Sequence, residues 1–399
     1  MGILVRKQRG GYDFTNIAKL SIVGLIISLS AAYVNTIWAI YMDSFFGSIV
    51  FVGILSAALT LISFIAYFLF IPVIEKSNKV KIFSYTIFFF IISYLLFAIN
   101  HNFYFFIILA VIITILFTLR ITSFGIIIRD NSKDNEVSSN EGVVYTFRNV
   151  AWVLGPLIAG FVASEFGVSW VFVLSALFLL IGLIIFNVSE IKSSEDKIKG
   201  NHNNFLKNFI EFFKDRNRVL AYVLGGGVNL WWVLIYLFIP LMIIRSHLSE
   251  LWVGYFLFGI AVPLILFEYV FAKWAGKHGF KKMFKVGYLI VSVMAFSCFF
   301  VSNIYIILSL LILASIGMAM LESTTESYFL DILNKRDKCR FYGPYNTAIN
   351  SGQLIGKIFG SVLLIFLPFK FLFLLFGGFM FLLFLTSFKV KDIIEVKKG

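Results

Sequence analysis

Segments of about 20 mostly apolar residues recur along nearly the whole chain, and each is long enough to cross the hydrocarbon core of a membrane. Hydrophobic residues make up 60% of the 399 residues and charged residues only 14%, a composition that excludes an ordinary soluble domain. In lipid, each backbone polar group must be satisfied within its own segment, and these segments are too long to be membrane strands. The sequence therefore predicts an all-α membrane protein.

Charged and polar residues divide the apolar sequence into twelve predicted membrane spans. They are 18–42, 47–74, 81–100, 103–129, 142–166, 169–188, 219–244, 250–275, 282–301, 304–331, 342–367 and 369–388. The first span follows the basic stretch "VRKQRGGYDF" and lacks a small-residue cleavage site. We therefore expect it to be a retained helix and not a signal peptide.

The longest predominantly polar stretch, 189–218, separates two sets of six predicted spans, 1–188 and 219–399. Within it, phenylalanines recur at helical spacing beside lysine and arginine. This pattern is typical of a short amphipathic helix on the cytoplasmic membrane surface. A soluble linker without such a helix is the alternative.

The two halves repeat each other at a shift of 201 residues. The segment "KSNKVKIF" (76–83) aligns with "KHGFKKMF" (277–284) at this shift. Further pairs at the same shift are Asp130 with Asp331, Gly142 with Gly343, Asn149 with Asn350, and Gly155 with Gly356. A parallel repeat of six spans is the layout of a transporter whose substrate site lies near the midplane, between the halves.

The net charge of +13 does not indicate a nucleic-acid partner, because the basic residues follow the predicted topology. An even number of spans places both termini on one side, and most of the 34 lysines and arginines lie on that side. Loops rich in these residues remain in the cytoplasm. We expect a multi-pass protein of the cell membrane with both termini cytoplasmic.

Two loops resemble motif A of the major facilitator superfamily, a Gly-x-x-x-Asp-Arg-x-Gly-Arg pattern. In "IEKSNKVK", Glu75 stands for the acid and Lys76 and Lys79 for the bases, but Ile71 replaces the first glycine. The echo "GKHGFKK" keeps Gly279 and has Gly276 in place of the acid.

The fifth span is similar to the antiporter motif of the same superfamily, Gly-x-x-x-Gly-Pro-x-x-Gly-Gly. Its sequence "AWVLGPLIAG" (151–160) keeps Gly155 and Pro156, whereas Ala151 and Ala159 replace two glycines. Small residues at this spacing let helices approach closely, which is also a common packing device in any membrane bundle.

The resemblance covers essentially the whole chain and implies twelve transmembrane helices in two pseudo-symmetric six-helix bundles. It further implies alternating access, a small-molecule substrate and a monomer. Glu75 would stabilise one conformation at the positive end of the eleventh helix. The alternative for the lysines of this loop is that they are solvated charges.

Five ionisable residues fall inside predicted spans, where each needs a physical reason. They are Arg120, Arg148, Glu322, Glu326 and Lys357. Arg120 and Glu322 each lie about 15 Å from the cytoplasmic end of their span. Bases in the first half and acids in the second, at matching depths, predict an inner gate and a link between gate state and proton binding.

Each of these residues also has a simpler interpretation. Glu326 would then face cytoplasmic water, Arg148 would reach the inner interface, and Glu322 would pair permanently with Lys357. Lys357 lies deep in its span and needs either that partner or an anionic ligand.

Other candidates for the cavity come from the first and seventh spans. With the charged residues, the predicted lining comprises Asn35, Trp38, Arg120, Asn229, Trp232, Tyr236, Glu322 and Lys357. Mixed aromatic and amide side chains suit an amphipathic or aromatic substrate. Tryptophan and tyrosine also form interfacial belts, which is the alternative reading.

The sequence contains no Gly-rich phosphate loop, no His-Glu-x-x-His and no nucleophile elbow, so an enzyme is not expected. Two cysteines and four histidines form no metal-ligand pattern. We expect no cofactor, and a proton gradient as the energy source. The leading hypothesis is proton-coupled export of a small organic or drug-like compound. The alternative is proton-coupled uptake of an organic anion or nutrient.

Overall fold

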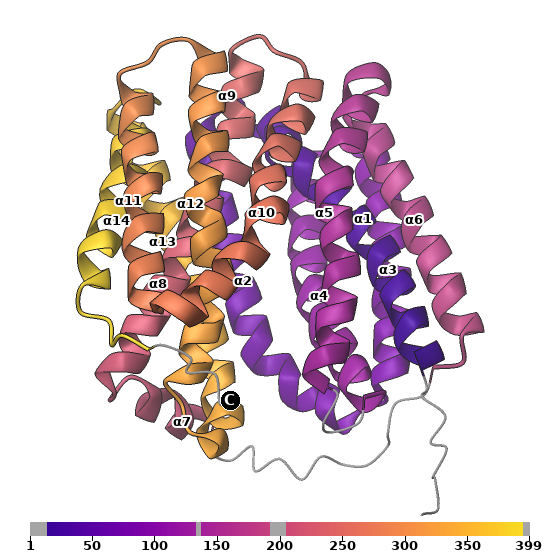
Figure 1. Ribbon diagram of the computed structural model, residues 1–399. Helices are drawn as coiled ribbons and strands as arrows, with labels where there is room; N and C mark the ends of the chain where they lie inside the picture. Colours follow the sequence, from indigo (N-terminus) through magenta and orange to yellow (C-terminus); the bar gives the residue numbers. More distant parts are fainter. Residues whose placement is uncertain (1–13, 133–136, 192–204, 394–399) are drawn as a thin grey trace, which may run out of the picture.

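The computed structural model describes residues 14–132, 137–191 and 205–393, all helices and short connections (Figure 1). In the first half the helices are α1 (Phe14–Phe46), α2 (Ile49–Lys76), α3 (Lys79–Ile99), α4 (Phe103–Asp130), α5 (Val137–Phe166) and α6 (Val168–Val188). The second half has α8 (Arg216–Val233), η2 (Leu234–Phe238), α9 (Ile239–Arg245), α10 (Glu250–His278), α11 (Phe280–Phe299), α12 (Ile304–Asp331), α13 (Lys335–Phe366) and α14 (Phe371–Ser387).

The predicted all-α architecture of twelve spans is confirmed. Eleven helices in the described residues are long and apolar enough to cross a membrane, and α14 is a shorter apolar helix. The elements α8, η2 and α9 together form one such span, Arg216–Arg245. The remaining helix, α7 (Phe205–Phe212), lies within the stretch 189–218 that separates the halves.

The helix bounds repeat with the shift of 201 residues found in the sequence. At that shift α4 (Phe103–Asp130) superposes on α12 (Ile304–Asp331) at both ends. The residues that precede α3 and α11, Asn78 and Gly279, are also equivalent. The Asn78 side chain caps its helix by accepting a 3.0 Å hydrogen bond from the Lys81 amide. The two six-helix bundles are therefore copies of one plan.

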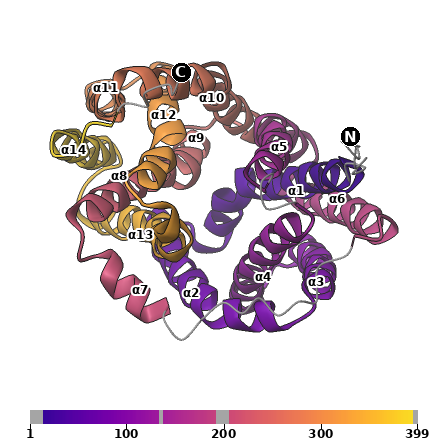
Figure 2. The same ribbon diagram turned by 60° about the horizontal axis from the view of Figure 1, so that its bottom comes forward.

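The helices of the two bundles are arranged around a central region, which Figure 2 shows obliquely from the end that is at the bottom of Figure 1. The start of α1 and the segment after α14 lie at the same end of the molecule, the bottom of Figure 1. We call this end the terminal face and the opposite end the far face. Helices α1, α3, α5 and α13 run from the terminal to the far face, and α2, α4, α10 and α12 run back.

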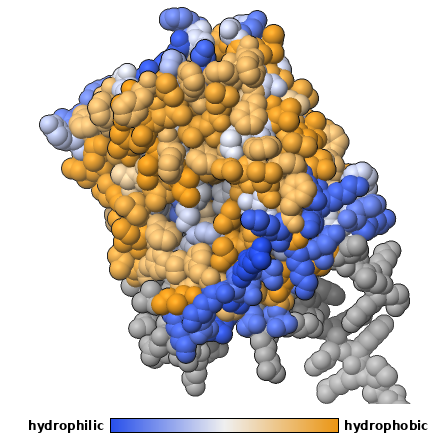
Figure 3. Space-filling model, turned by 90° about the vertical axis from the view of Figure 1, so that its left-hand side faces the viewer, coloured by the Kyte–Doolittle hydropathy of each residue, from blue (hydrophilic) through white to orange (hydrophobic). Residues whose placement is uncertain are grey.

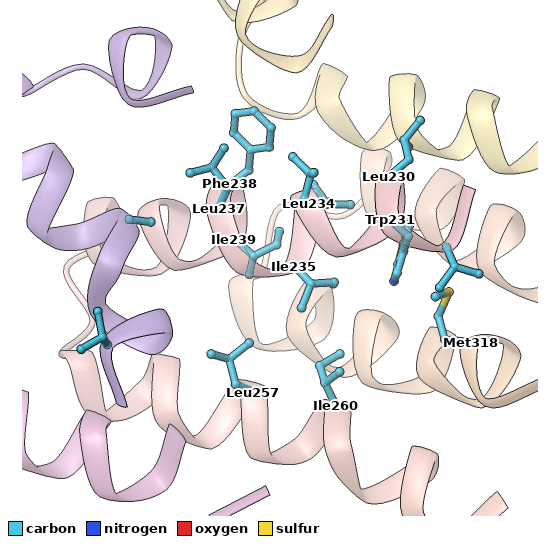
Figure 4. Close-up of a cluster of buried hydrophobic side chains, with 14 of the residues drawn as sticks. Leu230, Trp231, Leu234, Ile235, Leu237, Phe238, Ile239, Leu257, Ile260 and Met318 are labelled. Carbon is cyan, nitrogen blue, oxygen red and sulfur yellow. The ribbon is translucent and has the colours of Figure 1, made fainter. Parts of the chain in front are cut away.

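The seventh span contains a short π-helix, η2, that no sequence pattern predicted. Pro240 lies in the first turn of α9 and has no amide hydrogen to donate to the carbonyl four residues earlier. The helix accommodates this loss by widening for one turn. Buried side chains surround the wider turn: Ile235 and Ile239 point toward Leu257 and Ile260 of α10, and Trp231 lies near Met318 of α12 (Figure 4). Phe238 points the other way and packs against Phe376 of α14.

The outer surface of the bundle is apolar. Large hydrophobic side chains are exposed on most helices, including Phe88, Ile184, Val293, Phe359 and Leu382. Figure 3 shows this apolar band on one side, with hydrophilic residues gathered at the two ends of the molecule. In water such a surface would be unfavourable, whereas in a bilayer it faces lipid.

Candidate substrate cavity

A cavity of about 670 Å³ lies between the two bundles. Its walls come from α1 to α5 of the first half and from α8, η2, α10, α12 and α13 of the second. All eight side chains that the sequence suggested for the cavity line it: Asn35, Trp38, Arg120, Asn229, Trp232, Tyr236, Glu322 and Lys357. The volume lies within the range of about 300–1,000 Å³ that is typical of small-molecule sites.

The cavity is accessible from the terminal face. Among its lining residues, Ile121, Tyr145, Ile265 and Ile349 are exposed. Each of the four lies in the part of its helix nearer the terminal face. Tyr145, near the start of α5, has 55% of its surface exposed although it faces the interior of the bundle. A small molecule could therefore enter from this end.

At the far face the two halves are in close contact through small residues of α5 and α10. A Cβ atom added at Gly254 would lie 2.6 Å from the carbonyl oxygen of Pro156, and one at Gly160 would lie 2.9 Å from the Cα of Gly254. Only glycine at these positions permits the two backbones to approach so closely. The predicted small-residue stripe of the fifth span thus packs against the opposite half.

Gly155, another small residue of that stripe, packs within its own half. A Cβ there would lie 2.5 Å from the Cβ of Ala32 in α1. The two adjacent residues therefore have different neighbours, since Gly155 faces α1 and Pro156 faces α10.

Two further contacts join the halves towards the far face. Gly53 of α2 packs directly on Ser361 of α13, where a Cβ would clash with the hydroxyl. Arg245, at the end of α9, forms a 2.9 Å ion pair with Asp43 near the end of α1. In this conformation the cavity is closed at the far face and accessible from the terminal face.

Arg120 is the most enclosed base of the cavity. Only 6% of its surface is exposed, and its guanidinium lies over the rings of Phe90 and Phe117, at 4.9 Å and 5.2 Å from their centroids. These cation–π contacts stabilise the charge only partly. Its Nη1 atom has no hydrogen-bond partner and is free to bind a ligand.

Lys357 of α13 reaches across to the first half. Its Nζ donates a 2.7 Å hydrogen bond to Oγ1 of Thr60 and a 3.5 Å bond to the carbonyl of Ser56, both in α2. In this conformation the ammonium is held by α2 and not by Glu322, the partner considered from the sequence.

Glu322 of α12 supplies a carboxylate to the cavity, and its Oε2 atom is buried without a hydrogen-bond partner. A second acid, Glu268 of α10, lines the same cavity and interacts electrostatically with Glu322. Sequence reasoning missed Glu268. The signal was present, since it is a single acid within the apolar run "LILFEYVF", where an ionisable residue indicates a function.

The other two residues of the predicted inner gate do not line the cavity in this conformation. Arg148 of α5 donates a 3.3 Å hydrogen bond from Nε to the hydroxyl of Ser28 in α1. Glu326 is exposed and accepts a 2.7 Å hydrogen bond from the Tyr342 hydroxyl. Arg120 and Glu322 remain candidates for a pair that forms when the terminal face closes.

The residues of the motif A loops are placed only in part. The side chains of Glu75 and Lys76 lie outside the described part of the structure, whereas Lys79 is buried, with 3% exposed. Gly279 has a φ of +90°, which favours glycine. A Cβ there would also clash with the carboxylate of Asp392.

Aromatic side chains complete the cavity walls. Trp152 of α5 and Tyr236 of η2 meet across the two halves with ring centroids 6.3 Å apart, and Trp232 lies 5.5 Å from Tyr236. Trp38 packs edge-on against Phe97 at 5.5 Å while lining the cavity. A ligand in this cavity would contact both charged groups and aromatic rings.

A family model described as Major Facilitator Superfamily matches residues 20–267 and 257–393. The chain belongs to the major facilitator superfamily. This membership confirms the resemblance seen in the loops and the fifth span. It also identifies the protein as a multi-pass membrane transporter of small molecules and not an enzyme.

Solved structures share the fold at low sequence identity. A POT family transporter in complex with 5-aminolevulinic acid has a TM-score of 0.76 and 12% identity, over 94% of this chain and 96% of that one. A peptide transporter POT in complex with sulfate has a TM-score of 0.74 and 12% identity, over 94% and 93%. A bacterial homolog of the human lysosomal transporter Spinster, inward-facing and occupied, has a TM-score of 0.70 and 13% identity, over 95% and 96%.

A comparison with curated protein sequences finds no significant match. The likeness to the solved transporters therefore shows the fold, and the substrate must be inferred from the cavity of this chain.

Proposed function

We propose that this transporter exports a small organic compound from the cytoplasm in exchange for protons, by alternating access. One observation carries the proposal. The cavity is accessible from the terminal face, is closed at the far face by the packing of α5 on α10, and holds a carboxylate, Glu322, with an unpartnered oxygen.

The terminal face is assigned to the cytoplasm by charge. Basic residues gather at the helix ends on this face, including Lys79, Lys81, Lys277 and Lys282. Loops rich in lysine and arginine are retained in the cytoplasm. The protein would then reside in the cell membrane, with its cavity presented here to cytoplasmic substrate.

Glu322 is the proposed proton carrier because of its position between the halves. Charged, it attracts a cation or the guanidinium of Arg120; protonated, it attracts neither. If the carboxylate favours one conformation and the acid the other, proton binding and cavity orientation become linked. Glu268, on the neighbouring helix α10, adds a second acid whose negative charge repels that of Glu322.

The small-residue face of α5 supports exchange. Its motif resembles that of antiporters, and Pro156 and Gly160 form the contact with α10 that must separate when the far face opens. Binding energy from substrate or proton can act on this contact because the helices are held by close packing and not by ion pairs.

Uptake of an organic anion or nutrient is the second candidate. It is favoured by Arg120 and Lys357, which present two positive charges to the cavity. The solved neighbours that are peptide transporters, or that contain 5-aminolevulinic acid or sulfate, are consistent with a fold that accommodates small charged compounds.

Transport by purified protein in proteoliposomes tests both candidates. Aromatic amines and carboxylic acids would first be screened by their effect on thermal stability at two pH values. For each compound that stabilises the protein, a gradient of that compound is imposed and lumenal pH is followed with a dye. Export by exchange moves protons against the compound, whereas coupled uptake moves both in one direction. Flux with no proton movement would overturn the coupling.

A further inference from the structure

The two acids of the cavity and its arginine, Arg120, lie on different walls. Glu268 and Glu322 belong to α10 and α12, which pack against each other. Arg120 belongs to α4, which packs on α2, and α2 in turn holds the ammonium of Lys357. Figure 2 shows α10 and α12 across the central region from α4 and α2. One wall is therefore basic and the opposite wall acidic.

Arg120 and Glu322 each interact with a second residue that carries a charge of the same sign. Arg120 interacts with Arg148 and with the Tyr94 ring, and Glu322 interacts with Glu268. Neither wall is neutralised by its own residues. An ion of one sign would satisfy one wall and leave the other unpaired.

Two polar atoms on these walls are buried without hydrogen-bond partners, Nη1 of Arg120 and Oε2 of Glu322. Leaving a buried charged group unpaired is unfavourable, so such groups are normally paired or bind a ligand. Lys357, by contrast, already has two acceptors in α2. The unpartnered atoms thus mark two separate ends of a binding site.

We propose that the transported compound is a zwitterion of about dipeptide size, with its carboxylate bound by Arg120 and its ammonium group by Glu322. Glu268 adds negative charge beside the ammonium group. The rings of Trp152, Trp232 and Tyr236 contact the body of the molecule between its charged ends. This assignment rests on the proposed function, since it names the substrate of the same cavity.

A zwitterion also gives a physical reason for closure. Bound to both walls, it links α4 of one half to α12 of the other through two charge-assisted hydrogen bonds. It thereby offsets the repulsion within each wall and draws the terminal ends of the halves together. A cation or anion alone lacks this bridging effect.

Three matched probes test the proposal on the full-length protein. They are the dipeptide phenylalanyl-phenylalanine, its N-acetyl derivative, which is only an anion, and its C-terminal amide, which is only a cation. Affinity is measured by calorimetry at neutral pH. The dipeptide should bind at least about tenfold more tightly than either derivative, because each derivative loses one charge-assisted hydrogen bond.

Two variants assign the ends. Arg120→Gln should bind the dipeptide and the amide with equal affinity, and Glu322→Gln should bind the dipeptide and the N-acetyl derivative with equal affinity. Lys273→Gln and Glu165→Gln, at exposed sites of α10 and α5, serve as charge-matched controls and should keep the wild-type order. If a variant does not fold, the order of the affinities of the three probes for the wild-type protein still tests the proposal.

Equal binding of the dipeptide and the amide to wild type would overturn the proposal in favour of a cation site. Equal binding of the dipeptide and the N-acetyl derivative would overturn it in favour of an anion site. Failure of all three probes to bind would also overturn the proposal. The coupling is judged separately. Transport of the dipeptide without proton movement would leave the zwitterion site intact and rule out the exchange mechanism. Proton-coupled export of the amide alone would support the exchange mechanism and rule out the zwitterion site.

Discussion

Nζ of Lys357 in α13 lies 2.7 Å from Oγ1 of Thr60 in α2, so a lysine of the second half donates a hydrogen bond to the first half beside the cavity. The bond provides the ammonium group, deep in the bundle, with a hydroxyl as its partner in place of a carboxylate. It also makes α2 and α13 a joined pair on one wall. Mutating each residue in turn distinguishes the effect of losing the charge of Lys357 from the effect of losing its acceptor, Thr60.

Replacement of Thr60 should be more harmful than replacement of Lys357. Thr60→Val removes the shorter bond and leaves the ammonium with only the Ser56 carbonyl at 3.5 Å, a loss of about 1–3 kcal/mol of stability. Lys357→Met removes the charge together with its need for a partner and should cost less. Thermal unfolding of the purified variants measures the difference. An equal loss in both variants would contradict this account of the bond.

The contact between α5 and α10 should require glycine at position 254. A side chain in Gly254→Val would collide with the Pro156 carbonyl, since even a Cβ would lie 2.6 Å from it. The far face could then no longer close, and transport in proteoliposomes should fall at least tenfold. Gly142→Val is the matched control, because a Cβ there meets nothing within 4 Å. Normal transport by Gly254→Val would show that closure does not use this contact.

The ion pair between Asp43 and Arg245 should affect the conformational equilibrium more than stability. The side chains are 17% and 41% exposed, so the pair contributes less than about 1 kcal/mol and is screened by salt. Asp43→Arg should slow transport, and the double variant with Arg245→Asp should restore it. Transport rates at low and high salt check this. Failure of the double variant to recover would indicate that the pair has another role.

Glu322→Gln should abolish proton movement, because glutamine cannot carry the proton. Glu268→Gln should reduce proton movement only in part, since it removes a neighbouring charge and leaves Glu322 in place. Both are read from the lumenal pH of proteoliposomes. Glu165→Gln, an exposed acid near the far end of α5, is the control and should behave as wild type. Unchanged proton movement in Glu322→Gln would indicate that Glu268, and not Glu322, carries the proton.

Much of the cavity lining could be predicted because ionisable and amide side chains are rare in apolar helices. Their cost in lipid is a local property that can be read from the sequence, and the repeat places Arg120 and Glu322 at matching heights. Glu268 obeyed the same rule and was overlooked. The partners of Arg148, Glu326 and Lys357 could not be predicted, because helix depth does not give rotation about the helix axis.

The sequence by itself determined the twelve spans, the two-fold repeat and the family. These features depend on hydropathy, on the charged connections and on the constant shift between the two halves, all of which can be read from the sequence. Each span must also satisfy its own backbone hydrogen bonds in the membrane, so each can be recognised separately. Only the tertiary structure decided which face is closed and where the charges meet. The ammonium of Lys357 pairs with α2, Gly254 packs on Pro156, and the acids gather opposite Arg120, because side-chain packing between distant helices sets these contacts.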